Sequence, residues 1–198
     1  MMRDMPVYLD NNATTPLRKA AMTEMLSAMG PPANPSSVHG FGRNARLLVE
    51  SARESVATLA GCHPANVVFT SGGTESNNLV LAQYEHVITS AIEHDSVRHA
   101  HDRCQVIGVD ANGIIDLDQL AAKISMIDDM VKPNTIISVM AANNETDVLQ
   151  PIEKIAEMAC SSNLAFHSDM VQVFGKKHLD FNKSEISYAS FSAHKIGG

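Results

Sequence analysis

The chain has 198 residues, of which 44% are hydrophobic and 19% are charged, as is usual for a globular domain. Its net charge of −7, with acidic and basic residues interspersed, argues against a nucleic-acid surface, which would need clustered basic residues. Cys62, Cys104 and Cys160 show neither metal-ligand nor disulfide-framework spacing, and no apolar run resembles a secretory leader or a membrane span. We therefore expect a cytoplasmic protein with no membrane or metal partner.

Short runs rich in Val and Ile alternate with helical patterns along the chain. Helices are expected near residues 16–29, 43–60, 74–84, 95–103, 116–131 and 151–162. Strands are expected at Val67–Thr70, His86–Ser90, Gln105–Val109, Thr135–Ala142, Leu164–His167 and Ile186–Phe191. Several of these runs are apolar throughout, which is typical of a parallel sheet covered on both faces. The alternation predicts a three-layer α/β/α fold with right-handed crossovers.

Two helices carry the clearest local signals. An apolar stripe at 3.6-residue spacing runs along the second helix and consists of Leu48, Ala52, Val56 and Leu59. Gly61 is expected to end that helix in a left-handed conformation. Pro151 is expected at the first position of the last helix, where its missing N–H costs nothing.

The first candidate site follows the predicted strand Val67–Thr70. The segment Ser71–Asn78 (SGGTESNN) places two glycines before a helix, and Thr74 could cap that helix. Free N–H groups and the helix dipole would then form an anion site. An ordinary glycine turn is the alternative explanation for this segment alone.

Polar side chains also follow the other predicted strands. His94, Asn144, Asp169 and Lys195 each come just after one of them, and each alone has an ordinary structural explanation. In a parallel sheet, however, all these strand ends lie at one edge, where ligands bind. A lysine to form a Schiff base, a carboxylate to keep a pyridine nitrogen protonated and an anion site are what pyridoxal phosphate (PLP) requires. The combination favours a PLP site with Lys195 as the cofactor lysine.

Seven stretches resemble the NifS/IscS-like cysteine desulfurases of the class V aminotransferase family, which are fold-type I PLP enzymes. They are YLDNNATTP (8–16), NPSSVHGFGRNAR (34–46), FTSGGTESNN (69–78), EHDSV (93–97), NNETDVLQPI (143–152), HSDMVQVFGK (167–176) and SFSAHKIGG (190–198). They occur in the family's order and extend over the whole chain. The resemblance implies the large domain of a three-layer α/β/α PLP-dependent transferase.

The resemblance also implies a role for individual residues. Lys195 would form the aldimine with PLP, Asp169 would pair with the pyridinium nitrogen, and His94 would stack on the ring and move protons. Gln172 and Asn144 would reach the phenolic oxygen of the ring. The phosphate would be held by Gly73, Thr74, Ser192 and His194.

The family's reaction converts L-cysteine to L-alanine and transfers the sulfur to an enzyme persulfide, for Fe–S cluster assembly or tRNA thiolation. A homodimer and a sulfur-acceptor or Fe–S scaffold protein are the implied partners. Residues 1–15 would associate with a small domain, and residues 16–198 would form part of the PLP-binding large domain. Because the family's catalytic cysteine lies well past the cofactor lysine, the chain is expected to lack it, together with the C-terminal small domain, and to be inactive alone.

One departure from the family pattern concerns the cofactor loop. Asp147 stands where the family usually has a glycine after NNET. If Asp147 faces the cofactor it would disfavour an anionic substrate, and if it faces solvent it would matter little. Two alternatives to the desulfurase assignment remain: another class V PLP enzyme such as selenocysteine lyase, or a non-catalytic truncated remnant.

Overall fold

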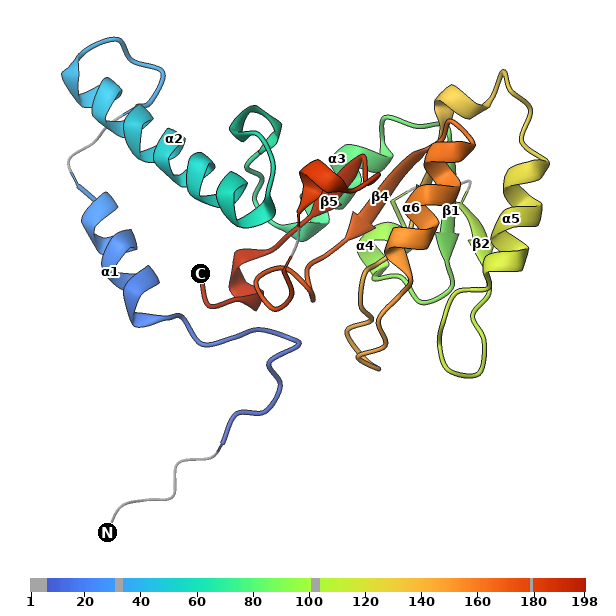
Figure 1. Ribbon diagram of the computed structural model, residues 1–198. Coiled ribbons are helices and arrows are strands. Elements are labelled where there is room, and N and C mark those ends of the chain that lie inside the picture. The colour runs from blue at the N-terminus through green and yellow to red at the C-terminus, as the bar shows by residue number, and fades with distance from the viewer. Residues whose placement is uncertain (1–6, 31–33, 101–103, 179) are drawn as a thin grey trace.

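The computed structural model describes residues 7–30, 34–100, 104–178 and 180–198 (Figure 1). Across these residues, five parallel strands form one sheet in the order β2-β1-β3-β4-β5. The strands are β1 (His86–Ser90), β2 (Cys104–Ile107), β3 (Thr135–Ser138), β4 (Ala165–Asp169) and β5 (Tyr188–Ser190). Because all five are parallel, their carboxyl ends lie at one edge of the sheet.

Some α-helices come before the first strand in the chain, and others connect successive strands. The α-helices are α1 (Lys19–Ala28), α2 (Gly40–Ala60), α3 (Gly73–Leu81), α4 (Asp95–Arg98), α5 (Leu117–Ser125) and α6 (Ile152–Ser161). Short 3₁₀ turns are η1 (Pro64–Asn66), η2 (Lys132–Asn134), η3 (Phe181–Lys183) and η4 (Ala193–Lys195). Gly61 ends α2 with φ 67°, as expected. Pro151 is the residue before the first turn of α6 rather than the first helical residue.

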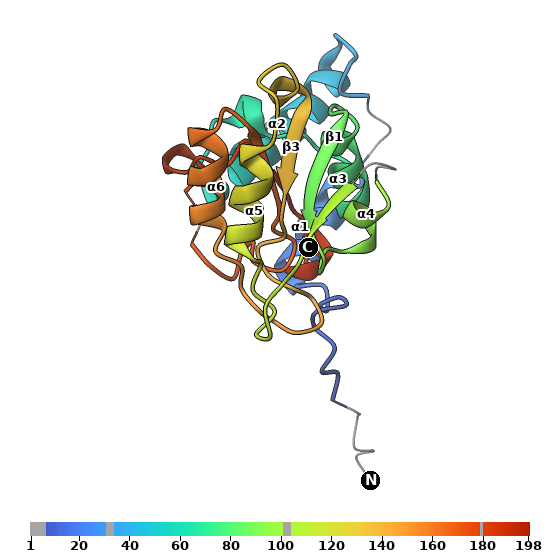
Figure 2. The ribbon, with the colours of Figure 1, turned by 90° about the vertical axis from the view of Figure 1, so that its right-hand side faces the viewer.

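The sheet lies between two layers of helices, which confirms the predicted α/β/α fold (Figure 2). On one face, α5 and α6 bury Leu120 and Ile155 against Ile137 and Phe166 of the sheet. On the other face, Leu81 of α3 and Val97 of α4 pack against strands β1 and β3. Every residue of β3 is buried, and its Ile136 and Ile137 pack on opposite faces, as expected for a strand covered on both sides. The edge strand β2, by contrast, is exposed at Gln105 and Val106.

The predicted strand Val67–Thr70 is wrong. This segment is not part of the sheet, and Val68 and Phe69 are exposed. The side chain of Arg53, from α2, donates to the carbonyl of Val67 and lies over the ring of Phe69 at 5.1 Å from its centroid. The segment has the apolar composition of a strand, but a strand also needs a neighbour to pair with, and none of the five described strands reaches it.

Other boundaries differ by a few residues. Strand β3 ends at Ser138, although Val139 and Ala141 still donate backbone hydrogen bonds to β4. Strand β4 extends two residues past the predicted end, so that Asp169 is its last residue. Helix α4 is only 95–98, and residues 101–103 of the helix predicted to extend to 103 lie outside the described residues. Helix α5 ends at Ser125, and a turn follows it where helix was expected.

Helices α1 and α2 project away from the sheet (Figure 1). All residues of α1 are described and none is buried, and α2 buries only Gly42, Ala57 and Ala60. The predicted apolar stripe of α2 is therefore uncovered, with Leu48 56% and Leu59 51% exposed. An amphipathic helix normally buries this stripe against another element.

The segment before α1 returns to the end of the chain. Thr15 donates its backbone N–H to the carbonyl of His194, and Arg18 donates to that of Gly197, both at 2.9 Å. Residues 10–18 therefore lie alongside 194–197, at the edge of the sheet where the strands end. No described helix is both long and apolar enough to cross a membrane.

Candidate active site

One cavity of about 520 Å³ opens at the carboxyl ends of the strands. Its lining brings together all nine residues proposed from the sequence, namely Gly73, Thr74, His94, Asn144, Asp169, Gln172, Ser192, His194 and Lys195. They come from the segments that follow β1, β3, β4 and β5 and from the start of α3. The parallel sheet places these distant segments at one edge.

Asp169 provides a buried carboxylate at the floor of the cavity. Asp169 as a whole residue is 6% exposed. One oxygen of its side chain accepts the backbone N–H of Val171 at 3.0 Å. The other oxygen accepts the side-chain amide of Asn77 at 2.8 Å. Among the described residues no cation forms an ion pair with it. A buried carboxylate held in this way is ready to accept a hydrogen bond from a cationic ligand.

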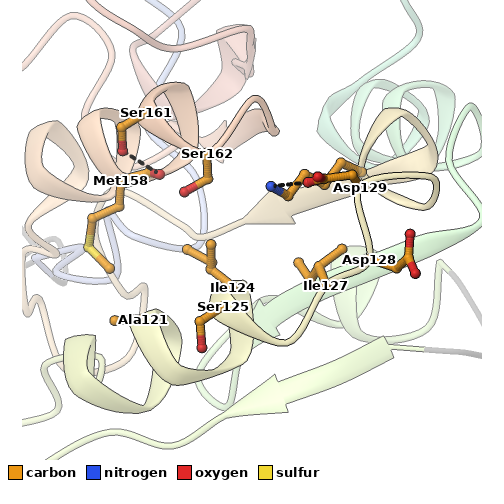
Figure 3. A pocket seen from close by; sticks show the side chains of 10 residues that line it. Ala121, Ile124, Ser125, Ile127, Asp128, Asp129, Met158, Ser161 and Ser162 are labelled. Carbon is orange, nitrogen blue, oxygen red and sulfur yellow. Dashed lines mark hydrogen bonds and ion pairs between the residues drawn. The ribbon is translucent and has the colours of Figure 1, made fainter.

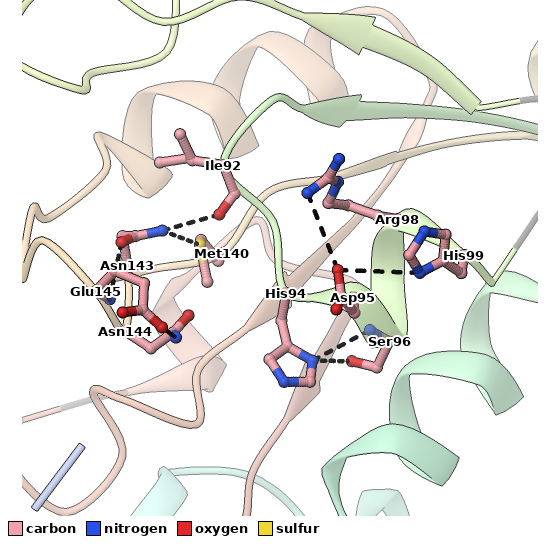
Figure 4. A network of polar contacts seen from close by, with 10 residues as sticks. All are labelled: Ile92, His94, Asp95, Ser96, Arg98, His99, Met140, Asn143, Asn144 and Glu145. Atoms are coloured by element: carbon pink, nitrogen blue, oxygen red, sulfur yellow. Dashed lines mark hydrogen bonds and ion pairs between the residues drawn. The ribbon is translucent and has the colours of Figure 1, made fainter. Parts of the chain in front are cut away.

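His94 is connected to Asp169 through two intervening side chains. The amide of Asn77 also donates to Ser96 Oγ at 2.8 Å, and that hydroxyl lies 2.8 Å from His94 Nδ1. The same Nδ1 accepts the backbone N–H of Ser96 at 3.1 Å, so His94 caps the short helix α4 (Figure 4). Because Nδ1 accepts, the neutral ring carries its proton on Nε2.

Lys195 reaches the N-terminal segment. Its Nζ donates to the backbone carbonyl of Asn12, and Gln172 Nε2 donates to the same oxygen at 3.0 Å. Partial burial lowers the pKa of Lys195, the charge of Lys176 adds to this effect, and Asp10 and Asp169 oppose it. A lysine must lose a proton to act as a nucleophile, and a lowered pKa makes this easier.

The other end of the cavity has the features of an anion site. Gly73 begins α3, and a Cβ built at this glycine would lie 3.2 Å from Val171 Cγ2. The expected cap by Thr74 is absent: the residue before the helix is Gly72, and no side chain caps it. Thr74 and Ser192 both line the cavity, while His194 Nδ1 lies 3.1 Å from Thr14 Oγ1. The helix N-terminus and the hydroxyl groups suit a phosphate.

Asn144 lies in a tight loop at the rim (Figure 4). Its side-chain amide donates to Glu145 at 2.7 Å. The neighbouring Asn143 shapes the loop, because its side-chain oxygen accepts the backbone N–H groups of Glu145 and Thr146, both at 2.9 Å. Asp147 belongs to the same loop but is exposed and does not line the cavity.

A second carboxyl group, Glu93, is buried behind His94. One of its oxygens accepts the hydroxyl of Ser90 and the backbone N–H of Met140, and the other has no partner among the described residues. Burial raises the pKa of Glu93 to about 8, the two hydrogen bonds act against this, and the charge of Asp169 adds to it. Burial therefore favours the protonated form of Glu93 in the folded chain.

Several lining residues were not singled out from the sequence. The most informative are Asp10, Asn12 and Asn77, which lie within the quoted stretches but had no expected role. Asn77 is 92 positions from its partner Asp169, so only the fold brings them together. Its side-chain oxygen is buried without a partner in the described part of the chain.

The cavity fits PLP in its donors and acceptors. A pyridinium N–H would find Asp169, and the side-chain oxygen of Asn77 is a further acceptor near the same place; within the described ranges Asp169 has no ion-pair partner and this oxygen has no hydrogen-bond partner. An aldehyde would find the amine of Lys195, and a phosphate would find the start of α3. The volume also suits a ligand of this size.

A second cavity of about 670 Å³ lies between the carboxyl-terminal ends of α5 and α6 (Figure 3). None of the nine proposed residues lines it. Its charged groups are Asp128 and an ion pair between Asp129 and Lys132 at 2.7 Å. It is therefore separate from the candidate active site.

The chain is similar to proteins named as cysteine desulfurases and NifS-like proteins. A family model described as aminotransferase class-V matches residues 7–198. A mitochondrial cysteine desulfurase of Saccharomyces cerevisiae is 38% identical over 98% of this chain and 41% of its own length. A NifS-like protein from Rickettsia africae superposes with a TM-score of 0.91 at 34% identity, over 96% of this chain and 55% of that one.

A third similar protein is a structure that contains cysteine. A structure described as SspA in complex with cysteine superposes with a TM-score of 0.85 at 33% identity, over 96% of this chain and 58% of that one. The chain spans about half the length of the curated relatives it matches, between 41% and 53% in the examples compared.

Proposed function

The chain belongs to the class-V aminotransferase family, and we propose that it forms the cofactor-binding part of a PLP-dependent cysteine desulfurase. The observation that carries the proposal is that one cavity is lined by both Lys195, an amine of lowered pKa, and Asp169, a buried carboxylate that has no ion-pair partner in the described part of the chain. L-cysteine as the substrate is supported by the names of the relatives and by the cysteine complex of a structural neighbour.

We assign the cavity residues to the parts of the cofactor. Lys195 and His94 would be the catalytic residues: Lys195 would carry the cofactor, and His94 would face the ring and exchange protons through Nε2. Asp169 accepts the pyridinium N–H, while Gln172 and Asn144 stand on the side of the phenolic oxygen. The phosphate is held at the start of α3 by Gly73 and Thr74, with Ser192 and His194 from the turn after β5.

When bound, PLP withdraws electrons from the substrate carbon that it activates. The protein's part is to hold charges and protons in place. Asn77 and the N–H of Val171 donate to the two oxygens of Asp169 and would hold its carboxyl group in place for the ring nitrogen. Ser96 fixes the tautomer of His94, so the proton available to the ligand is on Nε2.

The sulfur must be accepted by a thiol that reaches the cavity. Within the described residues no cysteine lines it: Cys62 follows α2, Cys104 begins β2 and Cys160 lies on α6. Burial raises the pKa of Cys62, and the neighbouring Glu185 raises that of Cys160, so neither thiol favours the reactive thiolate. We propose that none of the three is the persulfide cysteine and that this chain alone does not turn over cysteine.

The test separates cofactor binding from turnover. The 198-residue chain is incubated with PLP, reduced with borohydride and digested, and the lysine bearing the cofactor is identified by mass spectrometry. Label on Lys195 and its loss in Lys195→Ala support the proposal, whereas label spread over surface lysines contradicts it. Alanine production from L-cysteine by the same sample would contradict the statement about turnover.

The wider assignments rest on the same family membership. We propose that residues 16–198 form the PLP-binding large domain and that residues 1–15 associate with a smaller domain. We also propose a homodimer, supported by the uncovered apolar side of α1 and α2, in a cytoplasmic protein. The recipient of the sulfur would be an acceptor or Fe–S scaffold protein.

A further inference from the structure

Asp147 occupies a backbone conformation that few residues tolerate. Its φ is 59°, and the only other non-glycine residue with a positive φ in the described chain is Asn163. The loop imposes this value: the N–H of Asp147 donates to the carbonyl of Asn143, and the N–H of Asn143 donates to the carbonyl of Val148. A glycine would adopt the same conformation at no steric cost. The aspartate at this position therefore calls for a compensating contact.

That contact is with Asn12. The side-chain amide of Asn12 donates to the carboxylate of Asp147 at 2.6 Å, and to the carbonyl of Asn144 at 3.3 Å. The two partners are 135 positions apart, so the bond ties the N-terminal segment to the loop after β3. Asp147 itself is exposed and does not line the cavity, which is the case in which little effect on an anionic substrate is expected.

Asn12 in turn touches the cofactor lysine. Its backbone carbonyl accepts Lys195 Nζ and Gln172 Nε2. The side chain of Asn12 thus holds the loop while its main chain holds the lysine. A contact that holds the side chain of Asn12 therefore also restricts its backbone carbonyl, because both belong to the same residue.

We propose that Asp147 is a positioning residue that anchors Asn12 over the cavity and so holds the Lys195 amine against the Asn12 carbonyl until a ligand takes it. The inference rests on the proposed function for the meaning of Lys195, but the contact itself does not depend on it. Removing the side chain of residue 147 frees the segment around Asn12 and exposes the amine.

Two substitutions separate the side chain from the backbone. Asp147→Gly removes the acceptor and suits the left-handed backbone, so it does not threaten folding. Asp147→Asn keeps a side-chain oxygen for Asn12, and asparagine also tolerates this conformation. Asn163→Gly is the matched control, since it relieves a positive φ of 58° at the turn before β4, away from the cavity.

The experiment measures Lys195 without any cofactor. Each chain is treated with an amine-reactive ester over a range of pH, and the labelling of Lys195 is compared by mass spectrometry with that of the exposed Lys154. Asp147→Gly should raise the labelling rate of Lys195 about fivefold, the effect of one ordinary hydrogen bond on an opening equilibrium. It should also raise deuterium uptake in the peptide spanning residues 10–15. Asp147→Asn and Asn163→Gly should both match the parent.

Three results would overturn the inference: no change in Asp147→Gly, the same increase in Asn163→Gly, or an increase in Asp147→Asn equal to that in Asp147→Gly. Because no PLP is present, these outcomes are independent of the proposed function. That proposal fails separately, when borohydride fixes no cofactor on Lys195 in the parent chain.

Discussion

The buried carboxylate of Asp169 shows how one residue can make the cavity suitable for a cationic ligand. A carboxylate with so little exposure would ordinarily be paired or protonated, because burial penalises its charge. Here two N–H donors hold it, one from the main chain two residues on and one from Asn77 on α3. The donors support the anion without neutralising it, which leaves the charge for a ligand.

Asp169→Asn should therefore weaken PLP binding more than it weakens the fold. The amide oxygen can still accept from Asn77, but the charge that a pyridinium needs is gone. We expect the Kd for PLP to rise by about tenfold or more, as for the loss of a hydrogen bond to a charged group. Titration of PLP by absorbance measures this, with the exposed Asp118→Asn on α5 as the control. Equal Kd values for parent and Asp169→Asn would contradict the assignment.

The sequence alone predicts much of the candidate site, for a physical reason. In a parallel sheet the residue after each strand lies at one edge, so short polar motifs along the chain converge without further information. The contacts between side chains are harder to predict. The bonds from Asn77 to Asp169 and from Lys195 to Asn12 span 92 and 183 positions, and nothing in the local pattern specifies them.

At the level of elements, the end of α2 requires a glycine both for its backbone conformation and for the space around it. Gly61 has φ 67°, and a Cβ added there would lie 2.9 Å from the Cα of Asp180. The carbonyl of Gly61 also accepts the N–H of Asn182, so the helix end packs directly on the turn η3. Conformation and space both require glycine here.

Gly61→Ala should destabilise the chain. The left-handed conformation alone costs an alanine about 1–2 kcal/mol, and the contact with the backbone of Asp180 adds to this. Urea unfolding followed by circular dichroism should show a lower midpoint with an unchanged slope. Gly30→Ala is the control, since no described residue lies within 4 Å of a Cβ built at this glycine, and it should leave the midpoint unchanged. A Gly61→Ala chain as stable as the parent would show that η3 can move away.

The elements differ in how far sequence predicts them. Short runs rich in Val and Ile predict the five strands of the sheet, and the helical patterns between them predict the helices that cover it, because these elements contribute the apolar side chains of the core. The segment 67–70 has the same composition as those strands, but it pairs with none of the described strands. Composition alone does not show whether a neighbouring strand is available. The apolar stripe predicts helix α2, but it does not predict which surface the stripe packs against.

At the scale of the whole molecule, the uncovered side of α2 is the largest difference from an ordinary domain. Leu47 and Leu48 are 67% and 56% exposed, and Leu26 of α1 is 63% exposed. Apolar patches of this kind on a helix usually meet another chain. The proposed homodimer would cover them.

Replacing Leu47 and Leu48 together by glutamate should therefore prevent self-association. Burying two carboxylates in an apolar contact is strongly unfavourable, while on a free surface they cost little. Sedimentation equilibrium of the parent should give a dimer and that of the variant a monomer with the same circular dichroism. Met126→Glu, at the exposed end of α5, serves as the control and should stay dimeric. A parent that is monomeric at all concentrations would contradict this use of the surface.

The stability of the whole chain should depend on pH through two buried groups, whose effects on stability change with pH in opposite directions. His167 lies between the hydroxyls of Ser138 and Ser190, which tie three strands together, and burial lowers its pKa to about 3. The unfolded chain takes up this proton below pH 6.5 and the folded chain does not, so stability falls as the pH falls from 6.5 towards 3.

Glu93 has the opposite effect. Burial raises its pKa to about 8, so the folded chain keeps the proton that the unfolded chain loses above about 4.5, and stability falls as the pH rises from 4.5 to 8. Each slope approaches about 1.4 kcal/mol per pH unit, and the two oppose each other between pH 4.5 and 6.5. Urea unfolding across this range should show that Glu93→Gln removes the loss above pH 6.5 and that His167→Gln removes the loss below pH 4.5. Other titrating groups cancel when each variant is compared with the parent. An alkaline slope that survives Glu93→Gln would contradict this assignment, because it would mean that the carboxyl of Glu93 is already ionised in the folded chain.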